Sequence, residues 1–373
     1  MREGSRGHRE LREVVLAPKA FLRFPEPLHE RVGLGTDHLL TVLGAINWDT
    51  SIFEDRFAKQ GEEVPVNRVE EFSGGKGANV GVAAARILGK QRVAFVGALG
   101  NDDVSRKQLG ELRREGVITE GVVKLKGCQS GRAYIVVDGA GKKTIHTHFG
   151  ANERMTMRHL KRPRVLRAIE DTQMIVVMDA PTEVGRRAVE LAKGRGKTVV
   201  YSPAVRTREG LPSLEPILRE THYLVVDQIE LRNLYPDKAE AGEEELMRIV
   251  TTTHPYLTLV ATLGERGCAV TGEGVMTLVE GVDVTSLGKK VVNTTGCGDA
   301  FLGVFASYLL LDFPILEAAK RANLAGALKA TRYETRGSPS KAELEKEFET
   351  LEKVTQRRPV PRVSTGVWPV RRR

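Results

Sequence analysis

The sequence contains few cysteines, few side-chain amides and no long apolar run. Its 3 cysteines, Cys128, Cys268 and Cys297, form no CxxC pair among 373 residues, which argues against a disulfide scaffold or a structural zinc site. No segment approaches the roughly 20 apolar residues of a membrane-spanning helix, and the N-terminus lacks the apolar core of a signal peptide. We therefore expect a cytoplasmic protein without a membrane partner. Asn and Gln number only 15 together, a scarcity typical of thermophiles.

The positive charge is concentrated at the C-terminus. The formal net charge is +9, and residues 353–373 contribute seven cations and no acid. The rest of the chain is nearly balanced, so nucleic acid is not expected as its main partner. We interpret residues 353–373 as a basic tail that is either solvated or binds RNA or another protein. Residues 1–38 have little periodicity and are interpreted as a partly disordered N-terminal extension.

Short apolar runs alternate with helical patterns from residue 39 to residue 352. Strands are expected at 39–46, 92–99, 174–179, 198–202, 222–226 and 256–262, and helices at 77–88, 104–115, 183–193 and 243–250. This alternation predicts a three-layer α/β domain with a mainly parallel central sheet. Residues 49–72 and 122–149 instead alternate apolar with polar residues, which predicts a small β-sheet with one wet face. We expect that sheet to be a lid, a dimerisation surface, or both.

The strongest motif reads Asn-Thr-Thr-Gly-Cys-Gly-Asp-Ala-Phe over residues 293–301 and opens an apolar helix. Its glycines allow backbone amides to converge, and the helix dipole favours negative charge there. Asp299 is then a carboxylate beside an anion site, the arrangement that phosphoryl transfer to a hydroxyl requires. The alternative is a helix cap without chemistry.

Two further motifs are weaker. Residues 73–79 read Ser-Gly-Gly-Lys-Gly-Ala-Asn and offer Lys76 and Asn79 as donors before a helix, although the spacing is not that of a Walker A loop. Asn47 and Asp49 follow the first strand, where ligands collect in open α/β sheets. Asp49 in that position could hold sugar hydroxyls; its alternative role is a turn or a cap.

These motifs, in this order, resemble the ribokinase family, also called the PfkB carbohydrate kinases. The resemblance covers residues 39–350, and its matching segments are 74–79, 150–152, 202–206, 262–267, 294–299 and 322–323. It implies a ribokinase-like fold and an ATP- and Mg²⁺-dependent kinase that phosphorylates the hydroxymethyl group of a furanose-type sugar, ribose being the first choice. The alternatives are a nucleoside (adenosine, inosine or cytidine) or a sugar phosphate as acceptor. A remote alternative is an RNA- or partner-binding protein on an inactive kinase body.

The resemblance also implies roles for individual residues. Asp299 would be the catalytic base, and the anion hole would consist of the amides of Gly296, Cys297 and Gly298. The sugar hydroxyls would be held by Asn47, Asp49, Gly75, Lys76, Asn79 and Asp179. The nucleotide would be bound by Asp227, Glu230, Thr262, Gly264, Gly267 and Asn323, with Glu230 acting on Mg²⁺ through water.

Four positions depart from the family pattern. Asp227 replaces the usual Asn and adds a negative charge near the phosphates, and Asp179 stands where ribokinases favour Glu. Cys297 replaces Ala, which should have little effect on activity because the backbone amide, and not the side chain, would bind the anion. Asn293 replaces an Asp that often helps to bind a monovalent cation, and residues 329–340 depart as well, which makes activation by potassium doubtful.

Overall fold

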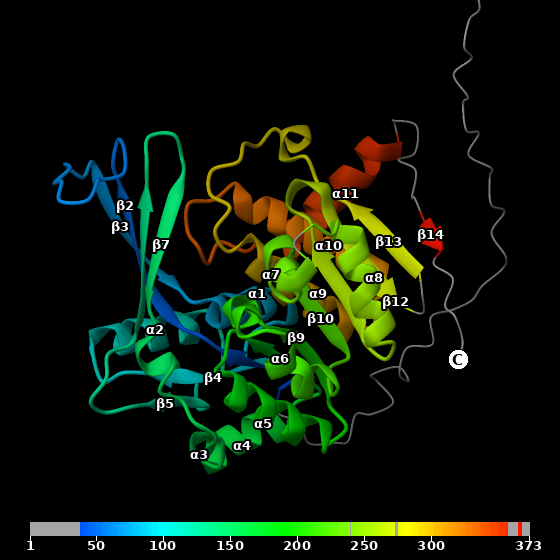
Figure 1. The fold of residues 1–373 in the computed structure, drawn as a ribbon, viewed down its shortest axis with the longest axis horizontal. Helices are drawn as coiled ribbons and strands as arrows, with labels where there is room; N and C mark the ends of the chain where they lie inside the picture. The colour runs from blue at the N-terminus through cyan, green and yellow to red at the C-terminus, as the bar shows by residue number, and fades with distance from the viewer. Residues whose placement is uncertain (1–37, 239, 273–274, 357–364, 368–373) are drawn as a thin grey trace, which may run out of the picture.

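The computed structural model describes residues 38–238, 240–272, 275–356 and 365–367, which form two sheets and their covering helices (Figure 1). In spatial order, the strands of the large sheet are β14 (Thr365–Val367), β13 (Val275–Glu280), β12 (Gly267–Gly272), β11 (Thr258–Thr262), β10 (Tyr223–Asp227), β9 (Thr198–Ser202), β8 (Met174–Met178), β1 (Leu40–Gly44), β4 (Val93–Leu99) and β5 (Val122–Lys124). The strands from β11 to β5 are parallel to their neighbours, and β12, β13 and β14 pair antiparallel.

The parallel strands are buried on both faces, which explains their unbroken apolar sequences. In β1 every residue is buried, and Leu40 lies opposite Val93 of β4 and Met174 of β8. Because parallel strands all end on the same side, their carboxyl ends form one edge of the sheet, where ligands bind in folds of this class. Asp179, Asp227 and Thr262 lie at the carboxyl ends of β8, β10 and β11.

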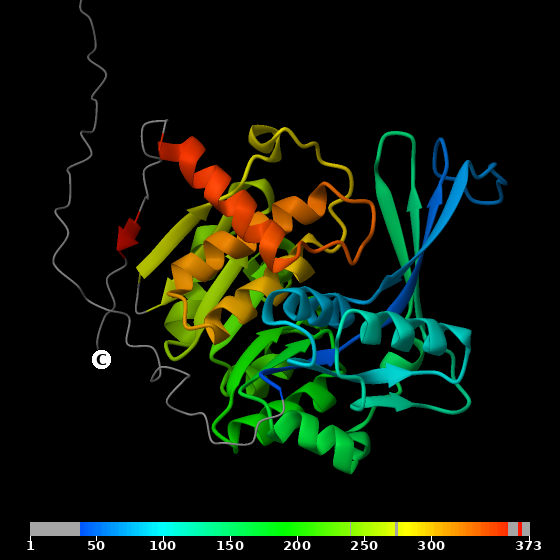
Figure 2. The same ribbon diagram turned by 180° about the vertical axis from the view of Figure 1, so that it is seen from behind.

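Helices cover both faces of the large sheet (Figure 2). One face packs against α1 (Lys76–Leu88), α2 (Asp103–Arg114), α9 (Cys297–Leu310), α10 (Ile315–Ala330) and α11 (Lys341–Gln356). The other packs against α3 (Met157–Leu160), α4 (Pro163–Glu170), α5 (Thr182–Lys193), α6 (Leu211–Leu218), α7 (Gln228–Asn233) and α8 (Glu243–Thr253). All residues of α9 from Asp299 to Leu310 are buried, as expected for a helix that is apolar all round.

The second sheet projects from the body and is called the lid below (Figures 1 and 2). In spatial order, its strands are β3 (Arg68–Gly74), β2 (Asn47–Phe53), β6 (Gly131–Val137) and β7 (Lys143–His148). Ala133 and Ile135 of β6 are buried, whereas the intervening Tyr134 is exposed. This alternation is the one-sided burial that the sequence predicts.

The predicted fold class is confirmed, with one strand placed differently from the expectation. Residues 122–124, expected in the lid, form β5 and extend the large sheet, because Val122 and its neighbours pair in parallel with Gly97–Leu99 of β4. Within the described residues no helix is long and apolar enough to cross a membrane.

The chain ends are described only in part. Of the predicted N-terminal extension, all but residue 38 lies outside the described residues. Helix α11 continues to Gln356, past the boundary expected at residue 352. Residues 365–367 of the predicted tail pair with β13 at the edge of the large sheet, whereas residues 357–364 and 368–373 lie outside the described part.

Candidate active site

The N-termini of α1 and α9 meet beyond the carboxyl end of β1. Helix α1 begins against β1: the Ala78 amide donates to the Ala45 carbonyl at 3.1 Å, and a Cβ on Gly77 would lie 2.7 Å from Gly44 Cα. Helix α9 packs closely on α1, since a Cβ on Gly303 would lie 2.6 Å from the Val80 carbonyl oxygen. The small residues therefore bring the early and late motifs into one site.

Asp299 lies in the first turn of α9 and is buried. Asn79 of α1 donates from Nδ2 to Asp299 Oδ2 at 2.8 Å, and no other hydrogen bond to this carboxylate is found within the described residues. Burial raises the pKa of Asp299, and the charge of Lys76 opposes this rise. A carboxylate with a raised pKa and a free oxygen is better suited to accept a proton than an ordinary carboxylate.

The segment that opens α9, residues 293–298, is called the anion loop below. Gly296 has φ = 86°, and a Cβ there would lie 2.3 Å from the Thr335 carbonyl oxygen, so both the conformation and the space require glycine. The first turn of a helix leaves its amides without intrahelical acceptors. Of these amides, that of Cys297 donates to the Thr294 carbonyl at 3.3 Å.

Lys76 places a cation near both Glu230 and Asp299. Its Nζ lies 3.5 Å from Glu230 Oε1. Burial alone would lower the pKa of Lys76, but the carboxylates of Glu230, Asp299 and Asp179 together raise it. Lys76 is therefore a permanent positive charge beside the candidate base.

Two further carboxyl groups are buried near Asp299. Burial raises the pKa of Asp49 to about 6, against the opposing charge of Arg336. Burial likewise raises the pKa of Asp179 to about 6, against the charges of Lys76 and Arg206. Asp179 Oδ1 is buried with no hydrogen-bond partner among the described residues. A buried polar atom without a partner is costly, which makes Asp179 a candidate for contact with a ligand.

Asn47 is oriented by a residue that the sequence analysis did not assign to the site. Asn152 donates from Nδ2 to Asn47 Oδ1 at 2.8 Å and to the Ile46 carbonyl at 3.1 Å, and its Oδ1 accepts from the Ile46 amide at 3.0 Å. Asn152 thereby fixes the start of β2, and with it the direction of the Asn47 side chain.

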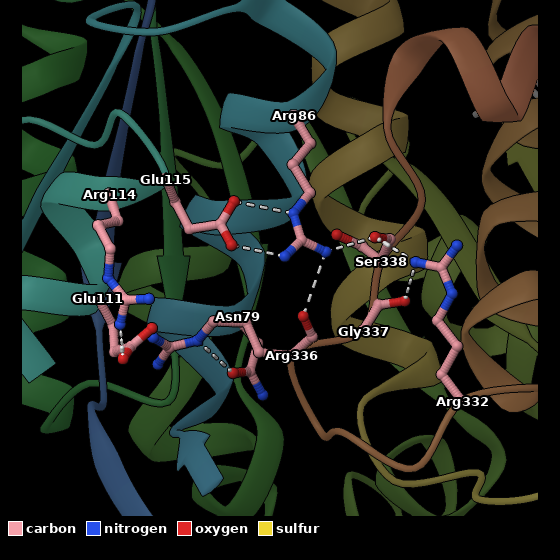
Figure 3. A network of polar contacts seen from close by, with 9 residues as sticks. All are labelled: Asn79, Arg86, Glu111, Arg114, Glu115, Arg332, Arg336, Gly337 and Ser338. Atoms are coloured by element: carbon pink, nitrogen blue, oxygen red, sulfur yellow. Dashed lines mark hydrogen bonds and ion pairs between the residues drawn. The ribbon is translucent and has the colours of Figure 1, made fainter.

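Arg336 is the main site residue that sequence reasoning missed (Figure 3). Its guanidinium donates to the Gly74 carbonyl at 2.8 Å, to Asn79 Oδ1 at 3.2 Å and to Gln108 Oε1 at 3.2 Å. Burial lowers its pKa to about 10, and the charge of Asp49 opposes this. Since Asn79 Oδ1 accepts from Arg336, its Nδ2 is turned toward Asp299. In a single sequence nothing distinguishes Arg336 from a surface arginine.

The loop around Arg336 is itself held by two other arginines. Arg86 of α1 makes a bidentate pair with Glu115 at 2.6 and 2.9 Å and donates to the Arg336 carbonyl at 3.3 Å. Arg332 donates to the carbonyls of Gly337 and Ser338, each at 2.9 Å (Figure 3). The position of Arg336 is thus set by α1 and by its own loop.

The residues expected to bind nucleotide cluster at the ends of β10 and β11. Asp227 lies opposite Thr262 across this strand pair. Asp227 Oδ1 accepts from the Glu230 amide at 2.7 Å, and Glu230 Oε2 accepts from the Asp227 amide at 3.1 Å, so Asp227 caps α7. Gly264 and Gly267 have positive φ of 62° and 97°.

Asn323 is engaged by the backbone of β13. It donates to the carbonyls of Val279 and Glu280 at 3.0 and 3.1 Å, which fixes this end of the sheet.

The tip of the lid reaches the anion loop. Lys143 of β7 donates from Nζ to Thr295 Oγ1 at 2.9 Å. Burial lowers the pKa of Lys143, and the nearby Cys297 opposes this. This hydrogen bond joins the lid to the anion loop.

A family model described as "pfkB family carbohydrate kinase" matches residues 37–342. The chain belongs to this family. It is 28% identical to a ribokinase of Haemophilus influenzae over 299 residues, which are 79% of this chain and 92% of that one. A ribokinase structure from Thermotoga maritima has a TM-score of 0.72 at 25% identity and covers 84% of this chain and 99% of that one. An Arabidopsis thaliana ribokinase structure with ribose and ATP has a TM-score of 0.72 at 22% identity, with coverages of 83% and 98%.

Membership of the pfkB family confirms the resemblance seen in the motifs. The protein is a phosphotransferase that acts on a carbohydrate hydroxyl. The geometry around Asp299 agrees with that chemistry, because the N-terminus of α9 lies beside the buried carboxyl groups of Asp299, Asp49 and Asp179.

Proposed function

We propose that the protein is an ATP- and Mg²⁺-dependent kinase for the hydroxymethyl group of a furanose, with ribose as the first acceptor to test. The observation that carries this proposal is a group of three buried carboxyl groups, Asp49, Asp179 and Asp299. Lys76 interacts with Asp179 and Asp299, and Arg336 interacts with Asp49. Asp179 has an oxygen that lacks a partner among the described residues. Ionised carboxylates accept hydrogen bonds only, so they suit the vicinal hydroxyls of a sugar. The ribose in the Arabidopsis ribokinase structure supports this choice.

In the proposed reaction Asp299 accepts the proton of the acceptor hydroxymethyl group. Its Oδ2 is held by Asn79 at 2.8 Å, which leaves the other oxygen for the substrate. Asp49, Asp179 and Asn47 hold the remaining hydroxyls. The hydroxymethyl oxygen then forms a bond to the γ-phosphorus as the bond from that phosphorus to the bridging oxygen breaks, and ADP leaves.

Negative charge on the transferring group is stabilised at the N-terminus of α9. The amides of Gly296 and Gly298 and the dipole of this helix of 14 residues provide fixed positive potential. Lys76 adds a full charge nearby. The Cys297 amide, which here donates to the Thr294 carbonyl at 3.3 Å, would join them.

Magnesium would neutralise the nucleotide phosphates. Within the described residues, no group of three or more His, Cys, Asp and Glu side chains could hold a metal ion. Mg²⁺ commonly keeps several waters and binds through one or two carboxylates plus substrate phosphates, and Glu230, aided by Asp227, fits this mode. Thr262, Gly264 and Gly267 would then line the nucleotide site.

The lid would close over the acceptor and exclude water, which otherwise competes for the phosphoryl group. Val69 and Ile145 are exposed on it, at 58% and 51%. A homodimer through these lid residues stays a prediction, which light scattering can check.

An acceptor panel tests the proposal. Ribose, fructose, adenosine, inosine, cytidine and ribose phosphates would each be incubated with ATP and Mg²⁺, and ADP release would be followed together with ³¹P NMR of the product. We expect a phosphomonoester on the hydroxymethyl carbon of ribose. A higher kcat/KM with a nucleoside or a sugar phosphate would reassign the acceptor, and ADP release that no acceptor stimulates would reject the kinase proposal.

A further inference from the structure

Lys329 lies in the last turn of α10, and among the described residues its buried ammonium makes no hydrogen bond or ion pair with a carboxylate. Its exposed fraction is 0%. Nζ donates to the Asn293 carbonyl at 2.9 Å and to the Arg332 carbonyl at 3.3 Å. Burying an ammonium costs far more than burying a methionine of similar length. Stability alone therefore does not account for a lysine here.

The two carbonyls belong to the two segments that form the base of the anion loop. The amides of Val292 and Asn293 donate to the Ala330 carbonyl at 2.7 and 3.0 Å, and Asn293 Nδ2 donates to the Tyr333 carbonyl at 2.8 Å. Asn293 Oδ1 in turn accepts from the Thr295 amide at 2.9 Å. Lys329 joins these two segments, because its ammonium donates to a carbonyl of each.

The position of Lys329 favours a positive charge, and this charge acts on Asp299. The carbonyls at a helix C-terminus carry partial negative charge, and α10 ends at Ala330. The charge of Lys329 also lowers the pKa of Asp299, against the larger effect of burial. Carbonyl oxygens arranged in this way are the ligands that small monovalent cations use.

These contacts do not fit a monovalent cation at Asn293, where the family often binds one. The Asn293 carbonyl is already engaged by the ammonium, and Asn293 brings an amide where a carboxylate would serve such an ion. We propose that the Lys329 ammonium is a built-in cation that positions the anion loop and replaces a bound monovalent ion. Lys329 is thus a positioning residue, and the kinase should work without potassium.

Two substitutions separate charge from space. Lys329→Ala removes the ammonium and leaves room for an ion, whereas Lys329→Met removes the charge and fills the room. Lys320→Ala is the matched control, because Lys320 lies on the same helix and is 52% exposed. Each protein would be assayed in choline, sodium, potassium and ammonium chloride at equal ionic strength, about 0.1 M.

We expect the wild type and Lys320→Ala to have the same rate in all four salts. Both Lys329 variants should lose about 10²-fold in kcat in choline chloride, with little change in KM for the acceptor. Potassium or ammonium should restore Lys329→Ala, whereas Lys329→Met should stay slow. Wild-type activation by potassium would overturn the proposal, as would a folded Lys329→Ala that is fully active in choline or inactive in every salt.

Thermal unfolding gives a second readout, which needs no acceptor. The rate measurements rest on the proposed function, because they need turnover of the acceptor. The measurement of Tm does not depend on that function. Potassium or ammonium should raise Tm of Lys329→Ala above its value in choline and leave the wild type unchanged. A wild type without turnover would reject the proposed function alone, and the Tm comparison would still decide the role of Lys329. If neither variant folds, a potassium-dependent Tm of the wild type contradicts the proposal, and an unchanged one supports it.

Discussion

Replacing Asp179 with Asn should stabilise the free protein and weaken acceptor binding. Asp179 is 8% exposed, its Oδ1 has no partner among the described residues, and its pKa is raised from 3.8 to about 6 by burial. Its φ of 55° is left-handed, a conformation that Asn tolerates at least as well as Asp. The substitution therefore removes a buried charge and no hydrogen bond of Oδ1.

The size of the effect follows from linkage. Folding raises this pKa, so the folded state holds the proton more tightly, and the wild type loses stability as pH rises from 3.8 to about 6. At about 1.4 kcal/mol per pKa unit, the variant should gain up to about 3 kcal/mol above this window and nothing below it. Acceptor affinity should fall by about 10- to 100-fold, the value of one charged hydrogen bond.

Urea unfolding at about pH 4 and about pH 8 measures the first effect, and calorimetric titration with the acceptor measures the second. Asp237→Asn is the control, because Asp237 is exposed and should show neither change. A variant that is no more stable than the wild type at pH 8 would refute the assignment of Asp179 as a desolvated, unpartnered carboxylate. A stabilised variant with unchanged acceptor affinity would remove Asp179 from the sugar site.

Three further changes test other parts of the site. Asp299→Asn should lower kcat by about 10²–10⁴ and leave MgATP affinity intact; a kcat near the wild-type value would exclude Asp299 as the base. Arg336→Met should raise the pKa of Asp49 above about 6, because the opposing charge is lost, and shift the acid limb of kcat/KM to higher pH; an unmoved limb would contradict this. Acceptor binding should slow amide exchange in β6 and β7 more than nucleotide alone does, and unchanged exchange would make the lid a static interface.

The elements with regular patterns could be predicted from the sequence. Strand β9 matches its predicted range, 198–202, because a short apolar run between polar turns is typical of a buried strand. The position of Asp299 in the first turn of α9 also followed from the glycines before it. Residues 122–124 were misassigned because three residues are too few to reveal which sheet they join.

The residues that the sequence could not reveal act through contacts between distant segments. Arg336 and Asn152 reach Asn79 and Asn47 from 257 and 105 residues away, and no local pattern records such a meeting. Asn323 donates to the backbone of β13, a contact that the sequence did not predict, and its role at the nucleotide stays a prediction. The contact of Lys329 with Asn293 also joins distant segments, so the sequence could not reveal it either.

Arg336 contacts residues that are far from it in the sequence, and this affects when the site can assemble during synthesis. Its contact with the Gly74 carbonyl closes a loop of 262 residues, and closing such distant contacts is slow relative to local ones. On the ribosome, β1, the lid and α1 are complete long before residue 336 leaves the exit tunnel. Until then Asp49 lacks the opposing charge of Arg336, and Asn79 Oδ1 lacks its Arg336 donor. A nascent chain, or a chain truncated before residue 336, is therefore expected to lack an assembled acceptor site even where its other parts have folded.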